Sequence, residues 1–503
     1  MSKIELYKRR ASSCWISAGI GIVAFVVMLW FFLVCHPIIP IDTDDWDLLC
    51  ANRNIFPQWH GWNPIKVFPE LMQSVAADIA GFVICPVFGL GYFESYAVSN
   101  AIIVSGFIAV YFCLFAKLLI CKYDVSWKMC TMLSAIFMII HFVFLRNAGV
   151  DNRYLFYDLN MTCYYNYFLP NIINAICVLW LLREDVFGSF REKKQFGKKL
   201  LFIVTLYFTI FSSIFSNIML ASLAGAKLLL GLINCLKVKQ FKLLEFIKGY
   251  LGWIIILVLW AVTQIFEMNG ARAASLEGHD FKQNFIESLK GIMIIRSEIN
   301  PRLVIFVKII VGVSIVLFIV NRKKKPWTDE KMWMLVVAFV ANTMYLILLC
   351  AKAGSTYITR VGVFFGIAFW GLLILVYLMK YCCDSFSWMK LVCGFAGVIL
   401  LFSINTRQGN TFMESNLLNA RKDEVIAIDN AIMNQVVEAD KSGLESMKLY
   451  VPWYDHPDNF PIATYGGERI TNTLYVHGVV SRFIAVDEVI PVKNFKELYY
   501  EQN

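Results

Sequence analysis

Four aspartates crowd into the short sequence DTDDWD, and they are the residues of this chain best suited to chemistry. They are Asp42, Asp44, Asp45 and Asp47. Carboxylates packed this closely repel one another, so at least one should have a raised pKa unless cations or a metal ion neutralise the group. Such a carboxylate suits a general base that removes a hydroxyl proton. The alternative is an N-cap and a solvated loop, because aspartate is common just before a helix.

Cations and aromatic residues follow these aspartates. Aromatic side chains at a membrane surface usually anchor a protein in the headgroup layer, but their faces also stack on sugar rings. Arg and Lys beside them can hold a phosphate group. We therefore predict Lys66 and Arg53 as phosphate ligands, and Trp46, Trp62 and His60 as contacts of a sugar or an acceptor.

The composition of the chain predicts the type of element that positions these residues. Of 503 residues, 58% are hydrophobic and only 17% are charged, which excludes an ordinary soluble globular chain. At about 20 apolar residues per crossing, the sequence predicts a mainly α polytopic membrane protein of about 11–13 transmembrane helices. The eleven clear runs cover 14–35, 98–120, 128–147, 162–182, 200–216, 219–236, 249–267, 303–320, 332–350, 361–379 and 390–405.

The charges between these runs give the orientation. Cytoplasmic loops hold an excess of Lys and Arg, and with eleven crossings the basic short connections share the side of the basic N-terminus. The tail 406–503 has 14 acidic and 9 basic residues, so the positive charge belongs to the membrane part. We predict an inside N-terminus and an outside tail, and nucleic-acid binding is not needed to explain the charge.

The stretch 67–90 would break this count if it crossed the membrane, because every later basic loop would then lie outside. It contains Pro69, Glu70, Asp78 and Pro86. Polar and irregular backbone at membrane depth is tolerated only where protein or water covers it. We therefore favour a re-entrant or interfacial helix, with a full crossing as the alternative.

Further cations and aromatic residues lie in the other connections predicted to be outside. An outward excess of cations runs against the positive-inside tendency, so we predict Arg272, Arg296 and Arg360 as additional phosphate ligands. The connection 148–161 adds candidate acceptor contacts, which are Asp151, Arg153 and Tyr154.

Two units follow from this organisation. Residues 1–405 form a membrane domain, whose first outer loop, 36–97, carries the aspartates. Residues 406–503 form a small extracytoplasmic α/β domain, in which 413–440 is a helix and the segments MKLYVPWY and FIAVDEVIPV are strands. The tail has no cysteine, so no disulfide framework is implied.

A basic N-terminus, one helix, an acidic DTDDW motif and a long first outer loop resemble the GT-C superfamily of integral-membrane glycosyltransferases. The segment WNPIKVFPE is similar to bacterial members of the DUF6056 or GtrII-like type. The resemblance implies an inverting transfer of a sugar from a polyprenyl phosphate to a glycan or lipid-linked acceptor at the outer face of the bacterial cytoplasmic membrane. It places the base at Asp44 or Asp45, with Asp45 preferred because it directly precedes Trp46. Some relatives use a divalent cation, magnesium or manganese, and others use none.

Two other functions are compatible with the sequence. A polysaccharide polymerase or ligase would concentrate arginines and a histidine in one late loop, and 268–302 fits that description weakly. A flippase or transporter of lipid-linked saccharide would show internal repeats and ionisable residues near helix midpoints. The sequence shows no convincing repeat, so the polymerase or ligase is the stronger alternative.

Overall fold

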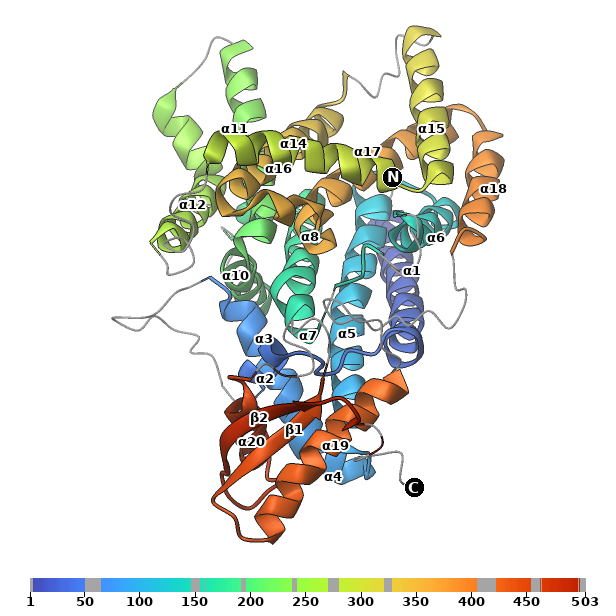
Figure 1. The fold of residues 1–503 in the computed structure, drawn as a ribbon. Coiled ribbons are helices and arrows are strands. Elements are labelled where there is room, and N and C mark those ends of the chain that lie inside the picture. Colours follow the sequence, from blue (N-terminus) through green and yellow to red (C-terminus); the bar gives the residue numbers. More distant parts are fainter. Residues whose placement is uncertain are drawn as a thin grey trace.

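The computed structural model is mostly helical and has one small sheet (Figure 1). It describes residues 3–49, 65–145, 154–158, 160–190, 196–237, 242–269, 280–320, 328–404, 422–453, 462, 464–495 and 497. The helices of the first half are α1 (Lys3–Trp30), η1 (Phe31–Cys35), α2 (Thr43–Asp47), α3 (Val67–Ile79), η2 (Ala80–Ile84), α4 (Cys85–Phe88), α5 (Tyr92–Cys121), α6 (Trp127–Val143), α7 (Met161–Cys163), η3 (Tyr164–Phe168), α8 (Leu169–Arg183), α9 (Val186–Ser189), α10 (Phe196–Ile210) and α11 (Ile214–Lys237). The second half has α12 (Leu243–Met268), α14 (Phe281–Glu298), α15 (Pro301–Val320), α16 (Glu330–Ala353), η5 (Ser355–Thr359), α17 (Val361–Ser385), α18 (Met389–Leu401), α19 (Lys422–Lys441), β1 (Ser446–Pro452), α20 (Gly467–Val476) and β2 (Ala485–Val492).

Nine helical segments among the described residues are long and apolar enough to cross a membrane, which indicates an integral membrane protein. Eight of them overlap predicted runs. Three other predicted runs correspond to the shorter helices α6, α10 and α18. The ninth long segment is Val67–Phe88, the stretch for which the sequence favoured a re-entrant or interfacial helix.

Val67–Phe88 forms one side of a helical hairpin with the start of α5. Gly89 turns the chain in the left-handed region, with φ 65°, and the Ser99 hydroxyl donates to the Ala76 carbonyl over 2.7 Å. Asn100 in α5 donates to the Ile38 carbonyl, just past the end of η1. The part of α5 before Asn100 is about 12 Å long at 1.5 Å per residue, so α5 extends by about that length past its contact with Ile38. Figure 1 shows the hairpin reaching from there toward the tail.

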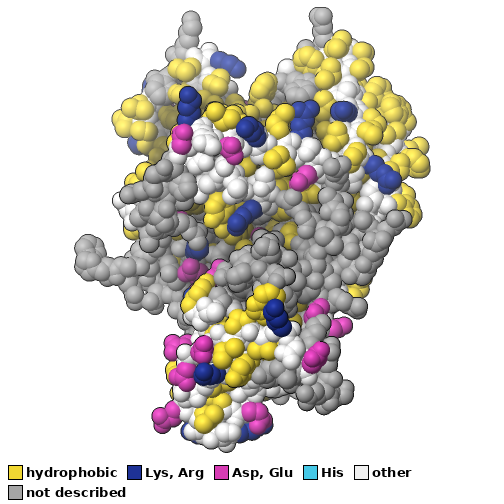
Figure 2. Space-filling view, in the orientation of Figure 1, with side chains coloured by type: hydrophobic (Ala, Val, Ile, Leu, Met, Phe, Trp, Pro, Cys, Tyr) yellow, Lys and Arg dark blue, Asp and Glu magenta, His cyan; other side chains and the backbone are white. Residues whose placement is uncertain are grey.

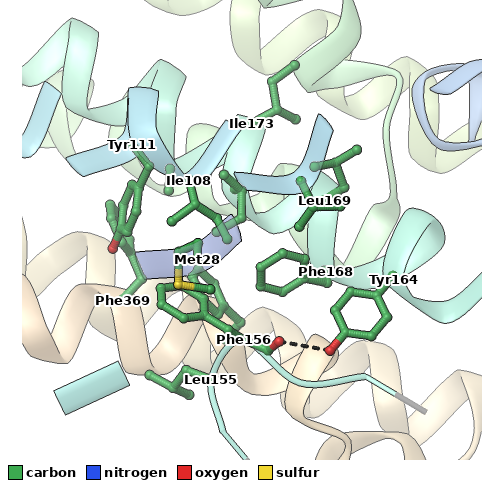
Figure 3. Packing of buried hydrophobic residues seen from close by; sticks show 14 of the residues in the cluster. Met28, Ile108, Tyr111, Leu155, Phe156, Tyr164, Phe168, Leu169, Ile173 and Phe369 are labelled. Atoms are coloured by element: carbon green, nitrogen blue, oxygen red, sulfur yellow. Dashed lines mark hydrogen bonds between the residues drawn. The ribbon is translucent and has the colours of Figure 1, made fainter. Parts of the chain in front are cut away.

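Aromatic and aliphatic side chains from α1, α5, η3 and α8 form the core beneath the acidic motif (Figure 3). Met28 and Ile108 are fully buried, and Phe156 and Phe168 meet at ring centroids 5.8 Å apart. The Tyr164 hydroxyl donates to the Phe156 carbonyl over 3.0 Å, which ties this core to the connection before α7.

The tail forms a small α/β unit, as its sequence predicts. The strands β1 and β2 pair in parallel, and α20 lies between them in the chain. The helix α19 lies within the predicted helix 413–440 apart from its last residue, and it buries Ile428, Ile432 and Val436; residues 413–421 lie outside the described residues. In Figure 2 acidic side chains gather over this lower end, while Lys and Arg are spread over the upper part.

One stacked aromatic pair tests the packing of the membrane part. The rings of Phe115 and Phe137 are parallel, with centroids 3.9 Å apart, and both side chains are fully buried. Because helices within a bilayer associate through packing, we expect Phe137→Ala to lower the free energy of unfolding by roughly 2–3 kcal/mol. Denaturation in mixed detergent micelles measures this. Phe395→Ala, at an exposed position of α18, should change it by less than about 0.5 kcal/mol.

Candidate functional site

The acidic motif forms a short helix, α2, at the end of the connection from α1. Asp42 is its N-cap, and the Asp42 carboxylate accepts from the Asp44 backbone N–H over 2.8 Å. Asp42 and Asp45 are buried, whereas Asp44 and Asp47 are exposed. The N-cap interpretation of the sequence is therefore correct for Asp42, and Asp44 and Asp47 remain accessible to other groups.

Buried hydrogen bonds fasten α2 to the start of α7. One Asp45 oxygen accepts from the Ile41 N–H over 2.9 Å and the other from the Thr162 N–H over 2.7 Å. The Asn160 side chain donates to Asp42 over 3.0 Å. In addition, the Thr162 hydroxyl donates to the Asp44 carbonyl over 3.0 Å. The first four residues of the motif are thus held by a segment far away in the sequence.

Two of the four aspartates, Asp45 and Asp47, have a raised pKa, and Asp45 has the larger shift of the two. Burial raises the pKa of Asp45 from its ordinary value, repulsion from Asp42 raises it further, and the donors at Ile41 and Thr162 oppose both effects. The balance raises the pKa of Asp45 to about 8. Burial, rather than the crowding of charges, is therefore the larger cause.

Asp44 and Asp45 differ in what they can reach. Asp45 is 0% exposed and both of its oxygens already accept hydrogen bonds. Asp44 is exposed, and its backbone rather than its carboxylate carries the contacts to Asp42 and Thr162. A base must lie within hydrogen-bond reach of the proton it removes. The geometry therefore favours Asp44, and it assigns Asp45 to holding the motif in place.

The two described aromatic candidates are part of the core. Trp46 is buried, and its ring contacts Phe93 edge-to-face at 5.8 Å. Tyr154 is buried between Phe31 and Phe142, at ring distances of 5.8 and 5.9 Å. Burial removes both rings from any sugar at the surface, so the predicted contacts of Trp46 and Tyr154 with a saccharide do not fit the structure.

Three predicted phosphate ligands are described, and Arg360 is the one with a recorded electrostatic link to the surroundings of the motif. Arg360 is exposed, its guanidinium lies 4.6 Å from the centre of the Tyr357 ring, and it acts electrostatically on Cys163 together with Asp42 and Asp45. Lys66 begins α3, where its N–H donates to the Ser212 carbonyl. Arg296 is exposed near the end of α14. Six other predicted residues lie outside the described residues, namely Arg53, His60, Trp62, Asp151, Arg153 and Arg272.

The tail contacts the motif and the hairpin through residues that the sequence did not single out. Arg469 in α20 pairs with Asp47, with 2.7 Å between Nε and Oδ1. The His477 ring lies on the hairpin, where its Nδ1 is 2.6 Å from the Tyr92 hydroxyl and 3.1 Å from the Tyr96 hydroxyl. Asp429 in α19 is buried and close enough to Asp45 for their charges to interact. No local pattern in the sequence marks these three residues.

Binding of a divalent metal ion would require a group of suitable side-chain ligands. Among the residues that the structure describes, no group of three or more His, Cys, Asp or Glu side chains could hold a metal ion. Use of magnesium or manganese therefore stays a prediction without a described ligand set.

Comparison with protein-family models, with curated proteins and with solved structures finds no match. The resemblance to the GT-C superfamily therefore rests on the residues of the acidic motif and on the layout of the apolar helices.

Asp429 provides a test of the buried acids. Its Oδ2 atom is buried without a hydrogen-bond partner, and burial together with repulsion from Asp45 raises its pKa well above the ordinary value. A folded protein that binds this proton more tightly than the unfolded chain loses stability as pH rises above the unfolded value. Asp429→Asn cannot ionise, so we expect its stability advantage over the parent to grow from about pH 5 to about pH 9.

Thermal unfolding of the purified protein over this pH range measures the effect. Asp423→Asn provides the control, because Asp423 is exposed near the start of the same helix. This variant should follow the parent at every pH. Parallel curves for Asp429→Asn and the parent would show that Asp429 ionises normally in the folded protein.

Proposed function

We propose that this chain is a membrane glycosyltransferase that moves a sugar, with inversion, from a polyprenyl-phosphate donor to a glycan or lipid-linked acceptor. The reaction would take place at the outer face of the bacterial cytoplasmic membrane. The observation that carries the proposal is the position of the acidic motif. The motif forms the short helix α2 just past the first apolar helix, hydrogen bonds to the start of α7 hold it, and Asp44 is exposed. The proposal needs a carboxylate held at the membrane surface, and Asp44 fits that requirement.

The transfer forms one bond and breaks one bond at the anomeric carbon of the donor sugar. Asp44 removes the proton of an acceptor hydroxyl, whose oxygen then attacks the anomeric carbon from the face opposite the phosphate. The bond between this carbon and the phosphate oxygen breaks, and the polyprenyl phosphate leaves with the electron pair. Its charge is spread over the phosphate oxygens, so no acid need protonate it.

Because no acid protonates the departing phosphate, cations must stabilise its negative charge. Arg360 is the described candidate for this stabilising cation, because it is exposed. Its charge acts on Cys163, as do the charges of Asp42 and Asp45. A planar guanidinium can contact two phosphate oxygens at once. Lys66 and Arg296 are the other described candidates for phosphate ligands.

The proposed topology has eleven crossings, with the N-terminus inside and the tail outside. The eleven crossings would be the eight long apolar helices that match predicted runs and the three shorter helices α6, α10 and α18. The hairpin of Val67–Phe88 would stay outside. Support comes from the contacts of this hairpin, since Gly81 packs so closely on His477 of the tail that an added Cβ would lie 3.0 Å from its ring. Asp78 and Phe82 lie beside the same histidine, and a helix that contacts an aqueous domain at its middle is badly placed to span a bilayer.

Substitution of the two aspartates tests the proposed base. Asp44→Asn should lower kcat for sugar transfer by about 100-fold or more, because the acceptor proton loses its base. Asp45→Asn should instead lower the stability of the protein, because an amide cannot accept from both N–H groups. Transfer is measured with polyprenyl-phosphate glucose, galactose and mannose, each carrying a radiolabelled sugar, in membranes of the expression host. Unchanged kcat in Asp44→Asn would exclude it as the base.

Labelling with an impermeant maleimide tests the topology. Lys441→Cys lies in the exposed last turn of α19, and the native Cys121 is exposed in a connection predicted to be cytoplasmic. We expect the introduced cysteine to react in intact cells and Cys121 to react only after the cells are permeabilised. The opposite pattern would invert the proposed orientation.

A further inference from the structure

Arg469 joins the two ends of the helix that carries Asp44. Its Nε atom lies 2.7 Å from an oxygen of Asp47, the last residue of α2, and its Nη1 atom donates to the carbonyl of Thr43, the first residue, over 3.3 Å. Asp44 lies between these two residues. A single side chain from the tail therefore contacts both ends of the short helix, in addition to the contacts from Asn160 and Thr162.

The same arginine compensates the charge next to Asp44. Burial and repulsion from Asp44 raise the pKa of Asp47 from its ordinary value, and the Arg469 guanidinium opposes both effects in part. The other ionisable groups near the motif are the acids Asp42, Asp45 and Asp429, together with His477 beside Leu49, Cys163 of α7 and Arg360, whose charge acts at Cys163. Among the described residues that contact the motif, Arg469 is the positive charge that holds an exposed member of the cluster.

Docking of the tail does not depend on Arg469. The side chains of the pair are 28% and 48% exposed for Arg469 and Asp47, and partly solvated ion pairs add little to stability. The tail is held elsewhere by the buried contacts of His477 with Tyr92 and Tyr96. Loss of the guanidinium should therefore disturb the position and the charge of Asp44 while the tail stays in place.

We propose that Arg469 is a positioning residue, through which the C-terminal domain orients α2 and keeps the Asp44 carboxylate in place for the transfer. This inference rests on the proposed function. Without Arg469, the charge of Asp47 is uncompensated, and a proton binds more readily to the acidic cluster. The acid limb of the pH profile of kcat should then move toward higher pH, an effect that loss of folding alone would not produce.

The test uses the full-length protein in lipid nanodiscs with the radiolabelled polyprenyl-phosphate sugars and acceptor membranes described above. We expect Arg469→Gln to lower kcat about tenfold, to leave KM for the donor within about twofold and to move the acid limb upward. Arg469→Lys should restore part of the rate because it keeps the charge. Asp47→Asn should restore the position of the acid limb in an Arg469→Gln background, since the uncompensated charge is then absent.

The matched control is Arg482→Gln, which removes another partly exposed arginine of the tail, paired with Asp440 over 3.3 Å and away from the motif. The proposal is overturned if Arg469→Gln transfers sugar with the kcat and pH profile of the parent while Asp44→Asn is inactive. It is also overturned if Arg469→Gln loses activity only together with a lower thermal midpoint than Arg482→Gln shows. Full activity of Asp44→Asn would instead refute the proposed base, and absence of transfer by the parent would refute both proposals.

Discussion

The burial of Asp42 and Asp45 is the constraint on which this end of the protein depends. A carboxylate taken out of water destabilises the fold unless donors surround it or a proton neutralises it, and an unsatisfied buried group costs roughly 1–3 kcal/mol. The donors here come from Asn160 and Thr162, 118 and 117 positions further along the chain. The buried carboxylates are therefore satisfied only when the start of α7 lies against the motif.

This constraint separates the four aspartates by role. Asp42 caps the helix and accepts a hydrogen bond from the Asn160 side chain. Asp45 is buried and largely neutral, and Asp47 forms an ion pair with Arg469. Asp44 alone among the four keeps an exposed carboxylate without a side-chain contact in the part of the chain that the structure describes. Crowded carboxylates can coexist because only some of them carry a full charge at neutral pH.

Local patterns in the sequence predicted the apolar helices and the two strands of the tail. They did not predict the partners of the motif, because a hydrogen bond between Arg469 and Thr43 joins residues 426 positions apart. The N-cap of α7 was accessible to sequence reasoning, since an asparagine precedes a helical segment there. Trp46 was misjudged for a physical reason, because an aromatic ring near a membrane surface suits a core as well as a ligand. Its burial depends on Phe93, which comes from another helix.

The size of the tail explains why the hairpin extends past the end of the first helix. A sheet of two strands is marginal by itself, so the small α/β unit must bury its surface against another element. The hairpin offers Tyr92 and Tyr96 to His477, and Gly81 permits the close approach of that ring. Because α20 is fixed in this way, Arg469 meets α2 in one geometry. The environment of Asp44 is therefore determined by the length of α5 as much as by the motif itself.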